Sequence, residues 1–174
     1  NFEIENTIYE DNTLKPVPKK KREQKKLSNI FQIKLLIKNN LTFSLESKNK
    51  IFNNDITIID TFGNLDTYFN KSEIVILGGS FISKGGHNPI EPAKYGCAIL
   101  TGNHIYNWQN VYDAMSKEKA CIVINKINDL KVQINNLIND KTILINYQKK
   151  AVDFSNKKFF DNDKLFKQID LVLN

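Results

Sequence analysis

The chain has 174 residues, of which 41% are hydrophobic, and a formal net charge of +6. This much apolar sequence can build one buried core, so we expect residues 1–174 to form a single domain. No run of about 18 apolar residues occurs, which excludes the pattern of a membrane-spanning helix, and we expect the fragment to be soluble.

Charge and cysteine content limit the classes of partner and site. The positive charge favours an anionic partner: a nucleic acid, a phosphorylated small molecule or an acidic membrane surface. Cys97 and Cys121 fit no metal-binding spacing and lie in apolar runs, so we expect buried, reduced thiols in a reducing compartment. The chain begins at Asn1, and we expect it to be a piece of a longer protein.

The first forty residues predict one helix. Residues 1–12 show no period and are expected to be a flexible start or an edge strand. A basic run, residues 19–26, opens an amphipathic helix that continues to Asn40. Three interpretations of the basic run stay open: a solvated helix turn, a contact with anionic lipid, or a contact with nucleic acid.

From residue 41 onward, strand patterns alternate with helical ones. Strands are predicted at residues 41–45, 56–60, 73–77, 97–101 and 120–124, and helices at residues 64–71, 88–95, 109–117, 127–139, 142–157 and 164–173. Strands separated by helices need crossover connections, which make a parallel sheet with helices on both faces. The sequence therefore predicts an α/β, Rossmann-like fold.

The stretch GGSFISKGGHNPIEP, residues 78–92, holds four of the seven glycines. It connects a predicted strand to a predicted helix, which is where ligands bind in open parallel sheets. Gly85 and Gly86 allow close approach of the backbone, and free N–H groups at the helix start would attract a phosphate. Walker and GxGxxG patterns are absent, which favours a mononucleotide with Glu91 on its sugar hydroxyls. A purely structural turn, capped by Asn88, is the alternative.

These residues resemble the signature of an enzyme family. Residues 78–108, GGSFISKGGHNPIEPAKYGCAILTGNHIYNW, resemble the donor-side signature of the 3-deoxy-D-manno-octulosonic acid (Kdo) transferases of lipopolysaccharide synthesis, in which GGS, GGHNxxEPA and GxHxxNF recur in this order. Residues 59–65, IDTFGNL, resemble the preceding DTxGEL element. The resemblance is specific between residues 56 and 108 and poor before residue 40.

The resemblance implies a GT-B glycosyltransferase with two Rossmann-like domains, of which this chain is the C-terminal, donor-binding half. The donor would be CMP-Kdo, and the whole enzyme would transfer Kdo to a lipid A precursor at the cytoplasmic face of a Gram-negative inner membrane. The general base would lie in the N-terminal acceptor domain, so we expect no catalytic residue in this chain and no activity from the chain alone. No metal or other cofactor is expected.

The resemblance also implies which residues bind the donor. The glycine loop would hold the CMP phosphate, and the backbone of the DTxGEL counterpart would line the nucleotide. The expected donor-binding residues are Phe62, Gly63, Gly79, Ser80, Gly85, Gly86, His87, Asn88 and Glu91. His87 is interpreted as a hydrogen-bond donor to the phosphate or the Kdo carboxylate, and His104 and Asn107 as residues that shape the loop.

The chain departs from the family pattern at two places. Asn64 stands where DTxGEL has Glu, and the PRHPER segment of the family has only the counterpart Pro18–Glu23, whose Lys19 and Lys20 are candidate contacts for a phosphate or carboxylate. Two other functions stay open: a GT-B transferase that uses a UDP-sugar, and a non-catalytic anion- or RNA-binding module. Competition between CMP and UDP distinguishes the UDP-sugar transferase from a Kdo transferase. Salt-sensitive RNA binding distinguishes the non-catalytic module from both.

Overall fold

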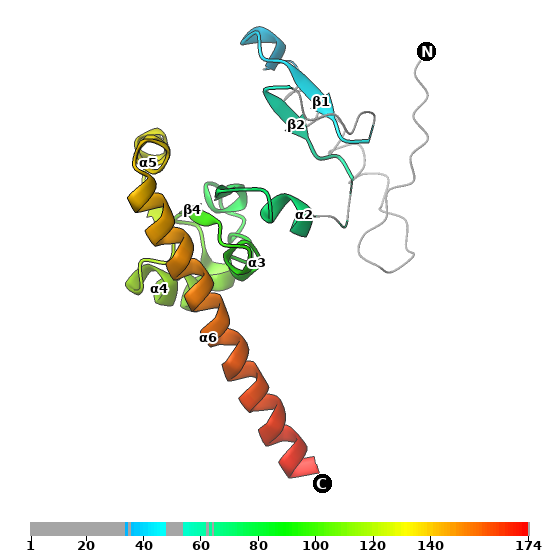
Figure 1. Ribbon diagram of the computed structural model, residues 1–174, viewed down its shortest axis with the longest axis vertical. Coiled ribbons are helices and arrows are strands. Elements are labelled where there is room, and N and C mark those ends of the chain that lie inside the picture. The colour runs from blue at the N-terminus through cyan, green and yellow to red at the C-terminus, as the bar shows by residue number, and fades with distance from the viewer. Residues whose placement is uncertain (1–33, 35, 48–53, 62, 64, 174) are drawn as a thin grey trace. The chain divides into compact units, whose positions relative to one another are not determined.

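The computed structural model describes residues 34, 36–47, 54–61, 63 and 65–173, with side chains as far as residue 157. The chain separates into two compact units, residues 1–65 and residues 66–174. Figure 1 shows their elements in chain order. Within the described ranges, no helix combines the length and the apolar character that crossing a bilayer requires.

The first unit contains the end of a helix. Residues 34 and 36–38 are helical, and the chain leaves the helix at Asn40, whose φ is +54°. The Leu41 N–H donates to the Leu36 carbonyl at 3.1 Å, which is the Schellman ending that a left-handed Asn or Gly allows. The predicted end of this helix is confirmed, whereas the basic run at residues 19–26 lies outside the described residues.

The first unit also contains two parallel strands. These are β1 (Phe43–Leu45) and β2 (Ile56–Ile58). Asp60, which belongs to the DTxGEL counterpart, follows β2 and accepts hydrogen bonds from the Ser47 N–H at 3.0 Å and the Ser47 hydroxyl at 2.6 Å. The Asp60 carboxylate therefore fastens the turn that leaves β1.

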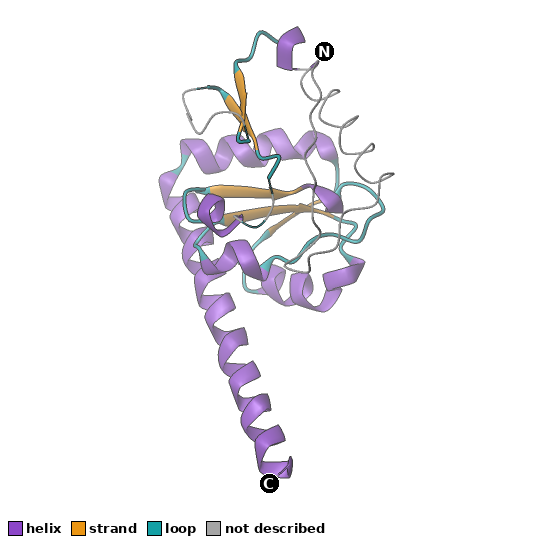
Figure 2. Cartoon of the chain, turned by 90° about the vertical axis from the view of Figure 1, so that its right-hand side faces the viewer, coloured by secondary structure: helices purple, strands orange, loops and turns teal. Residues whose placement is uncertain are grey.

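The second unit is a parallel sheet between helices (Figure 2). Its elements are α2 (Leu65–Phe69), β3 (Ile74–Leu77), η1 (Gly78–Ser80), α3 (Ile90–Lys94), β4 (Ala98–Gly102), η2 (Tyr106–Trp108), α4 (Gln109–Lys117), β5 (Ile122–Ile124), α5 (Ile127–Asn139) and α6 (Lys141–Leu173). The strand order is β3-β4-β5, and each neighbouring pair is parallel. The predicted α/β class is confirmed, and the predicted bounds of α4 and α5 are correct.

The C-terminal helices differ from the prediction. Two helices were expected at residues 142–157 and 164–173, but α6 is continuous from Lys141 to Leu173. No Pro or Gly occurs within it to interrupt the backbone hydrogen bonds. Asp140 separates α6 from α5, because its Oδ1 accepts the Thr142 N–H at 2.9 Å and caps the new helix.

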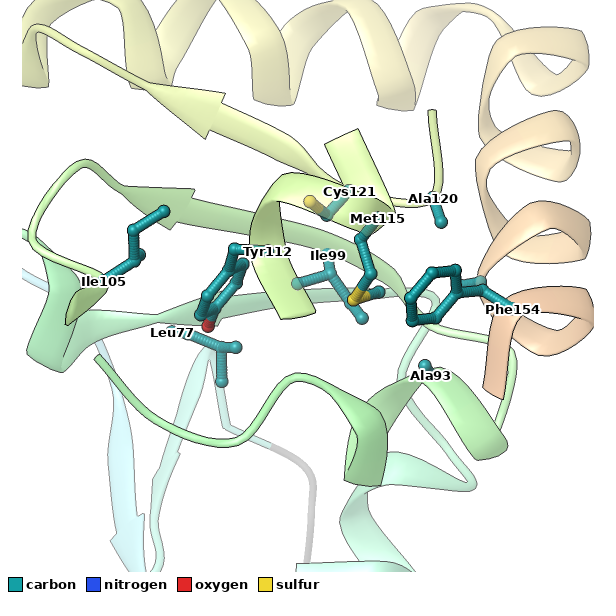
Figure 3. Close-up of a cluster of buried hydrophobic side chains, with 10 residues drawn as sticks. Leu77, Ala93, Ile99, Ile105, Tyr112, Met115, Ala120, Cys121 and Phe154 are labelled. Atoms are coloured by element: carbon teal, nitrogen blue, oxygen red, sulfur yellow. The ribbon is translucent and has the colours of Figure 1, made fainter. Parts of the chain in front are cut away.

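Two hydrophobic clusters cover the two faces of the sheet. The first, shown in Figure 3, lies on the side of α3 and α4 and includes Leu77, Ala93, Ile99, Tyr112, Met115 and Phe154. The second lies on the side of α5 and includes Ala98, Leu100, Ile124, Leu137 and Leu144. Successive residues of β4 enter opposite clusters because side chains alternate along a strand. The core therefore lies on both faces of β4, which is buried at every position.

Both cysteines are free and buried, as predicted. The Cys97 thiol donates to the Phe69 carbonyl at 3.2 Å. Burial raises the pKa of Cys97 to about 11 and also raises the pKa of Cys121. Both residues are therefore protonated at neutral pH, and they act as small apolar side chains of the core.

Candidate functional site

The loops after β3 and β4 are joined at Ser80. The Ser80 hydroxyl donates to the Leu77 carbonyl and accepts the Gly102 N–H at 2.6 Å, and the Ser80 carbonyl accepts the His104 N–H at 3.0 Å. Ser80 is fully buried. Its hydroxyl is therefore used inside the protein, where it holds the two loops together at the carboxyl edge of the sheet.

Gly85 and Gly86 are required by the backbone and by close packing. Their φ angles are +86° and +75°, a region that costs an L-residue about 1–2 kcal/mol. A methyl group at Gly85 would overlap the Asn107 side chain, and one at Gly86 would stand 3.3 Å from the His104 carbonyl oxygen. Both glycines are buried. The space that their missing side chains leave is therefore occupied by the loop after β4.

The segment of η2 and α4 supports the glycine loop through hydrogen bonds to four carbonyl groups. The donors and acceptors are the Tyr106 hydroxyl to Ser83 (3.2 Å), the Asn107 side-chain amide to Lys84 (3.1 Å), the Asn107 N–H to Gly85 (3.0 Å) and the Tyr112 hydroxyl to His87 (2.8 Å). Burial raises the pKa of Tyr112 to about 12, so this hydroxyl remains a donor at neutral pH.

Sequence reasoning identified only part of this support. It assigned a loop-shaping role to His104 and Asn107, and both make the backbone contacts described above. It missed Tyr106 and Tyr112. Tyr112 has the spacing of a core residue on α4 and does lie in the core, and nothing in the sequence indicates that its hydroxyl reaches a loop 25 residues earlier.

Four predicted site residues form a cluster at the surface. The His87 side chain lies against Gly79, where a methyl group would stand 2.8 Å from the His87 Nε2. The Asn88 side-chain amide donates to Glu91 Oε1 at 3.3 Å. His87 and Glu91 are exposed, and Gly79 and Asn88 are half-buried. The structure therefore places the His87 imidazole against Gly79 and the Asn88 amide against the Glu91 carboxylate, and the two pairs are joined through the neighbouring residues His87 and Asn88.

The start of α3 offers fewer free N–H groups than the sequence predicts. A helix was expected from residue 88 to 95, but α3 has only five residues, because Pro89 precedes it and the left-handed Gly96 follows it. Asn88 Oδ1 already accepts the Ile90 N–H at 3.0 Å, and Pro92 has none to offer. An anion at this edge would therefore depend more on the loop than on the helix dipole.

Phe62, Asn64, Lys19 and Lys20 lie outside the described residues. Gly63 is exposed with a φ of +94°, and it belongs to the first unit, which is described by itself. Within the part of the chain that the structure describes, no group of three or more His, Cys, Asp or Glu side chains could hold a metal ion.

Curated proteins that resemble the chain are 3-deoxy-D-manno-octulosonic acid transferases. The protein of Haemophilus influenzae is 30% identical over 110 residues, which are 62% of this chain and 26% of that protein. The protein of Rickettsia prowazekii is 30% identical over 141 residues, which are 75% of this chain and 30% of that protein. The probable mitochondrial transferase of Arabidopsis thaliana is 31% identical over 102 residues. The chain thus spans less than a third of the length of these relatives.

A solved structure shares the fold. The crystal structure of the C-terminal CMP-Kdo binding domain of WaaA from Acinetobacter baumannii matches with a TM-score of 0.67 and 19% identity, over 75% of this chain and 68% of that domain. No family model matches the chain. The solved domain shares the fold, and the curated proteins share sequence with the chain. The resemblance that the motifs indicate is confirmed: the chain is a relative of the 3-deoxy-D-manno-octulosonic acid transferases.

Proposed function

We propose that this chain is the donor-binding part of a Kdo transferase and that it binds CMP-Kdo at the edge formed by Gly79, His87, Asn88 and Glu91. The observation that carries the proposal is this exposed cluster. It lies at the carboxyl edge of a parallel sheet, its three side chains belong to the GGHNxxEP motif, and the fold is shared with a CMP-Kdo binding domain.

Each side chain of the cluster has a role that fits a nucleotide sugar. The exposed His87 imidazole can donate a hydrogen bond to the phosphate or to the Kdo carboxylate. The Glu91 carboxylate can accept hydrogen bonds from both ribose hydroxyls, and the Asn88 amide already orients it through its 3.3 Å bond. Gly79 leaves the space in which the His87 ring lies.

The reaction of the whole protein would be transfer of Kdo from CMP-Kdo to a lipid A precursor at the cytoplasmic face of the inner membrane. The attacking acceptor hydroxyl would be deprotonated by a general base in an N-terminal domain, so this chain alone would not catalyse transfer. Its contribution would be to bind CMP and to stabilise the charge that develops on the departing nucleotide. No metal is part of this proposal.

Titration of the isotope-labelled 174-residue chain with CMP, and separately with UDP, tests the proposal. We expect CMP to shift the backbone amides of Gly79, Gly85, Gly86, Asn88 and Glu91 at lower concentration than UDP does. Stronger shifts with UDP would instead favour a UDP-sugar transferase. No shift of these amides at saturating CMP, together with salt-sensitive RNA binding, would favour the non-catalytic module.

Substitution of Glu91 tests its role against a matched control. Glu91→Gln keeps the size of the side chain but replaces the charged acceptor, so we expect CMP affinity to fall about 10-fold or more. Asp129→Asn removes the same charge from the exposed first turn of α5 and is expected to leave affinity unchanged. Equal affinities for the two variants would show that Glu91 acts only through net charge or not at all.

A further inference from the structure

All four supporting hydrogen bonds of the glycine loop come from one side. Tyr106, Asn107 and Tyr112 lie within seven residues of the chain, and each donates to a main-chain carbonyl of residues 83–87. We call these three residues the loop clamp. No hydrogen bond of the clamp involves the side chains of His87, Asn88 or Glu91, so the clamp acts on the main chain of the loop.

The clamp determines the orientation of the peptide planes in the loop. In a trans peptide the carbonyl and the following N–H point in opposite directions, and the described residues contain no cis peptide. Because the carbonyls of Lys84, Gly85 and His87 face the clamp, the N–H groups of the residues that follow them point away from it. Loss of a clamp bond would allow these planes to rotate, and the two glycines offer little resistance to that rotation.

Tyr112 is the member of the clamp whose hydroxyl is separable from its packing. Its ring fills the first core cluster beside Leu77 and Met115, as Figure 3 shows, and a phenylalanine would fill the same space. What the hydroxyl adds is the 2.8 Å bond to the carbonyl of His87. The accepting carbonyl belongs to the peptide group that links His87 to Asn88, so this bond affects the direction of both side chains.

We infer that Tyr112, with Asn107, is a positioning residue that holds residues 83–88 in the conformation that binds the nucleotide. This inference rests on the proposed function, because the ligand is the nucleotide proposed above. A binding-competent loop conformation that is only partly populated lowers the apparent affinity by that fraction. Removal of one net hydrogen bond from the clamp is therefore expected to lower CMP affinity about 3- to 10-fold.

The test uses Tyr112→Phe and Asn107→Ala in the 174-residue chain, with Tyr147→Phe as the matched control. Tyr147 packs against the second core cluster, on the other face of the sheet. In the ligand-free chain we expect both clamp variants to accelerate hydrogen exchange at the backbone amide of residue 107, which donates to the Gly85 carbonyl, by about 3- to 10-fold while exchange in β4 is unchanged. CMP affinity, measured by titration calorimetry, should fall by a similar factor. The control should change neither quantity.

Each outcome bears on a different statement. If exchange at the backbone amide of residue 107 is unchanged in both clamp variants, or if it accelerates while CMP affinity stays at the wild-type value, the positioning role is wrong. If exchange accelerates equally in β4, Tyr112 has only a general stabilising role, which also overturns the inference. If the wild-type chain does not bind CMP, the proposed function fails, while the exchange rates still decide whether the clamp holds the loop. Asn107 is exposed, so Asn107→Ala is expected to fold, and it provides the test alone if Tyr112→Phe does not fold.

Discussion

Replacement of Gly85 by alanine is expected to destabilise the second unit more than replacement of another left-handed glycine of the same unit. Gly85 has a φ of +86°, and a methyl group there would overlap the Asn107 side chain, whose amide donates to the Lys84 carbonyl. Gly96 has a φ of +73°, but a methyl group there would meet only the Val152 Cγ2, at an ordinary 3.5 Å. The two variants therefore share a backbone cost and differ in packing.

The magnitudes follow from these two terms. The left-handed backbone costs an alanine about 1–2 kcal/mol at either position. At Gly85 the displaced Asn107 amide also loses its hydrogen bond, which adds about 0.5–1.5 kcal/mol. We therefore expect Gly85→Ala to lower the free energy of unfolding by about 1.5–3.5 kcal/mol and Gly96→Ala by about 1–2 kcal/mol.

Urea denaturation, followed by circular dichroism and analysed by linear extrapolation, measures both losses. The double variant Gly85→Ala, Asn107→Ala provides the control, because it removes the side chain that the new methyl group would meet. It should lose less stability, relative to Asn107→Ala, than Gly85→Ala loses relative to the wild type. Equal losses for Gly85→Ala and Gly96→Ala would refute the reasoning, since the contact with Asn107 would then carry no cost.

Two further predictions concern the core. Phe154 of α6 is 2% exposed and packs in the first cluster, so Phe154→Ala should lower the free energy of unfolding, measured by urea denaturation, by about 3–5 kcal/mol. The control Asn156→Ala, at an exposed position of the same helix, should change it by less than about 0.5 kcal/mol. A loss below about 1 kcal/mol for Phe154→Ala would contradict the packing of α6. Burial raises the pKa of Cys97 from 9.0 to about 11, so folding favours the neutral thiol, and its contribution to stability should be complete below pH 9 and lost as the pH rises from 9 to 11. The urea midpoint of the wild type should therefore fall more steeply over this interval than the midpoint of Cys97→Ala. Identical pH profiles for the two proteins would count against a buried thiol.

Much of the fold follows from local sequence pattern. The alternation of β-branched runs with helical spacing predicted the parallel α/β class, and the bounds of α4 and α5 were correct because each has a clear apolar period between loops. The prediction left residues 158–163 between two helices, and the polar residues within this gap do not end a helix unless they supply a competing cap. Its length was therefore not readable from composition alone.

The sequence by itself also indicated the similarity to the Kdo transferases, because the motifs within residues 78–108 have an unusual order and spacing. It indicated that Gly85 and Gly86 allow close approach of the backbone, but it did not show which residues pack against them. The tertiary structure decided that these glycines pack against the loop after β4, that the hydroxyl of Ser80 is used internally, and that Tyr112 supports the carbonyl of His87. These contacts join residues 18 to 25 positions apart, and such pairs come together only when parallel strands bring their carboxyl ends to one edge of the sheet.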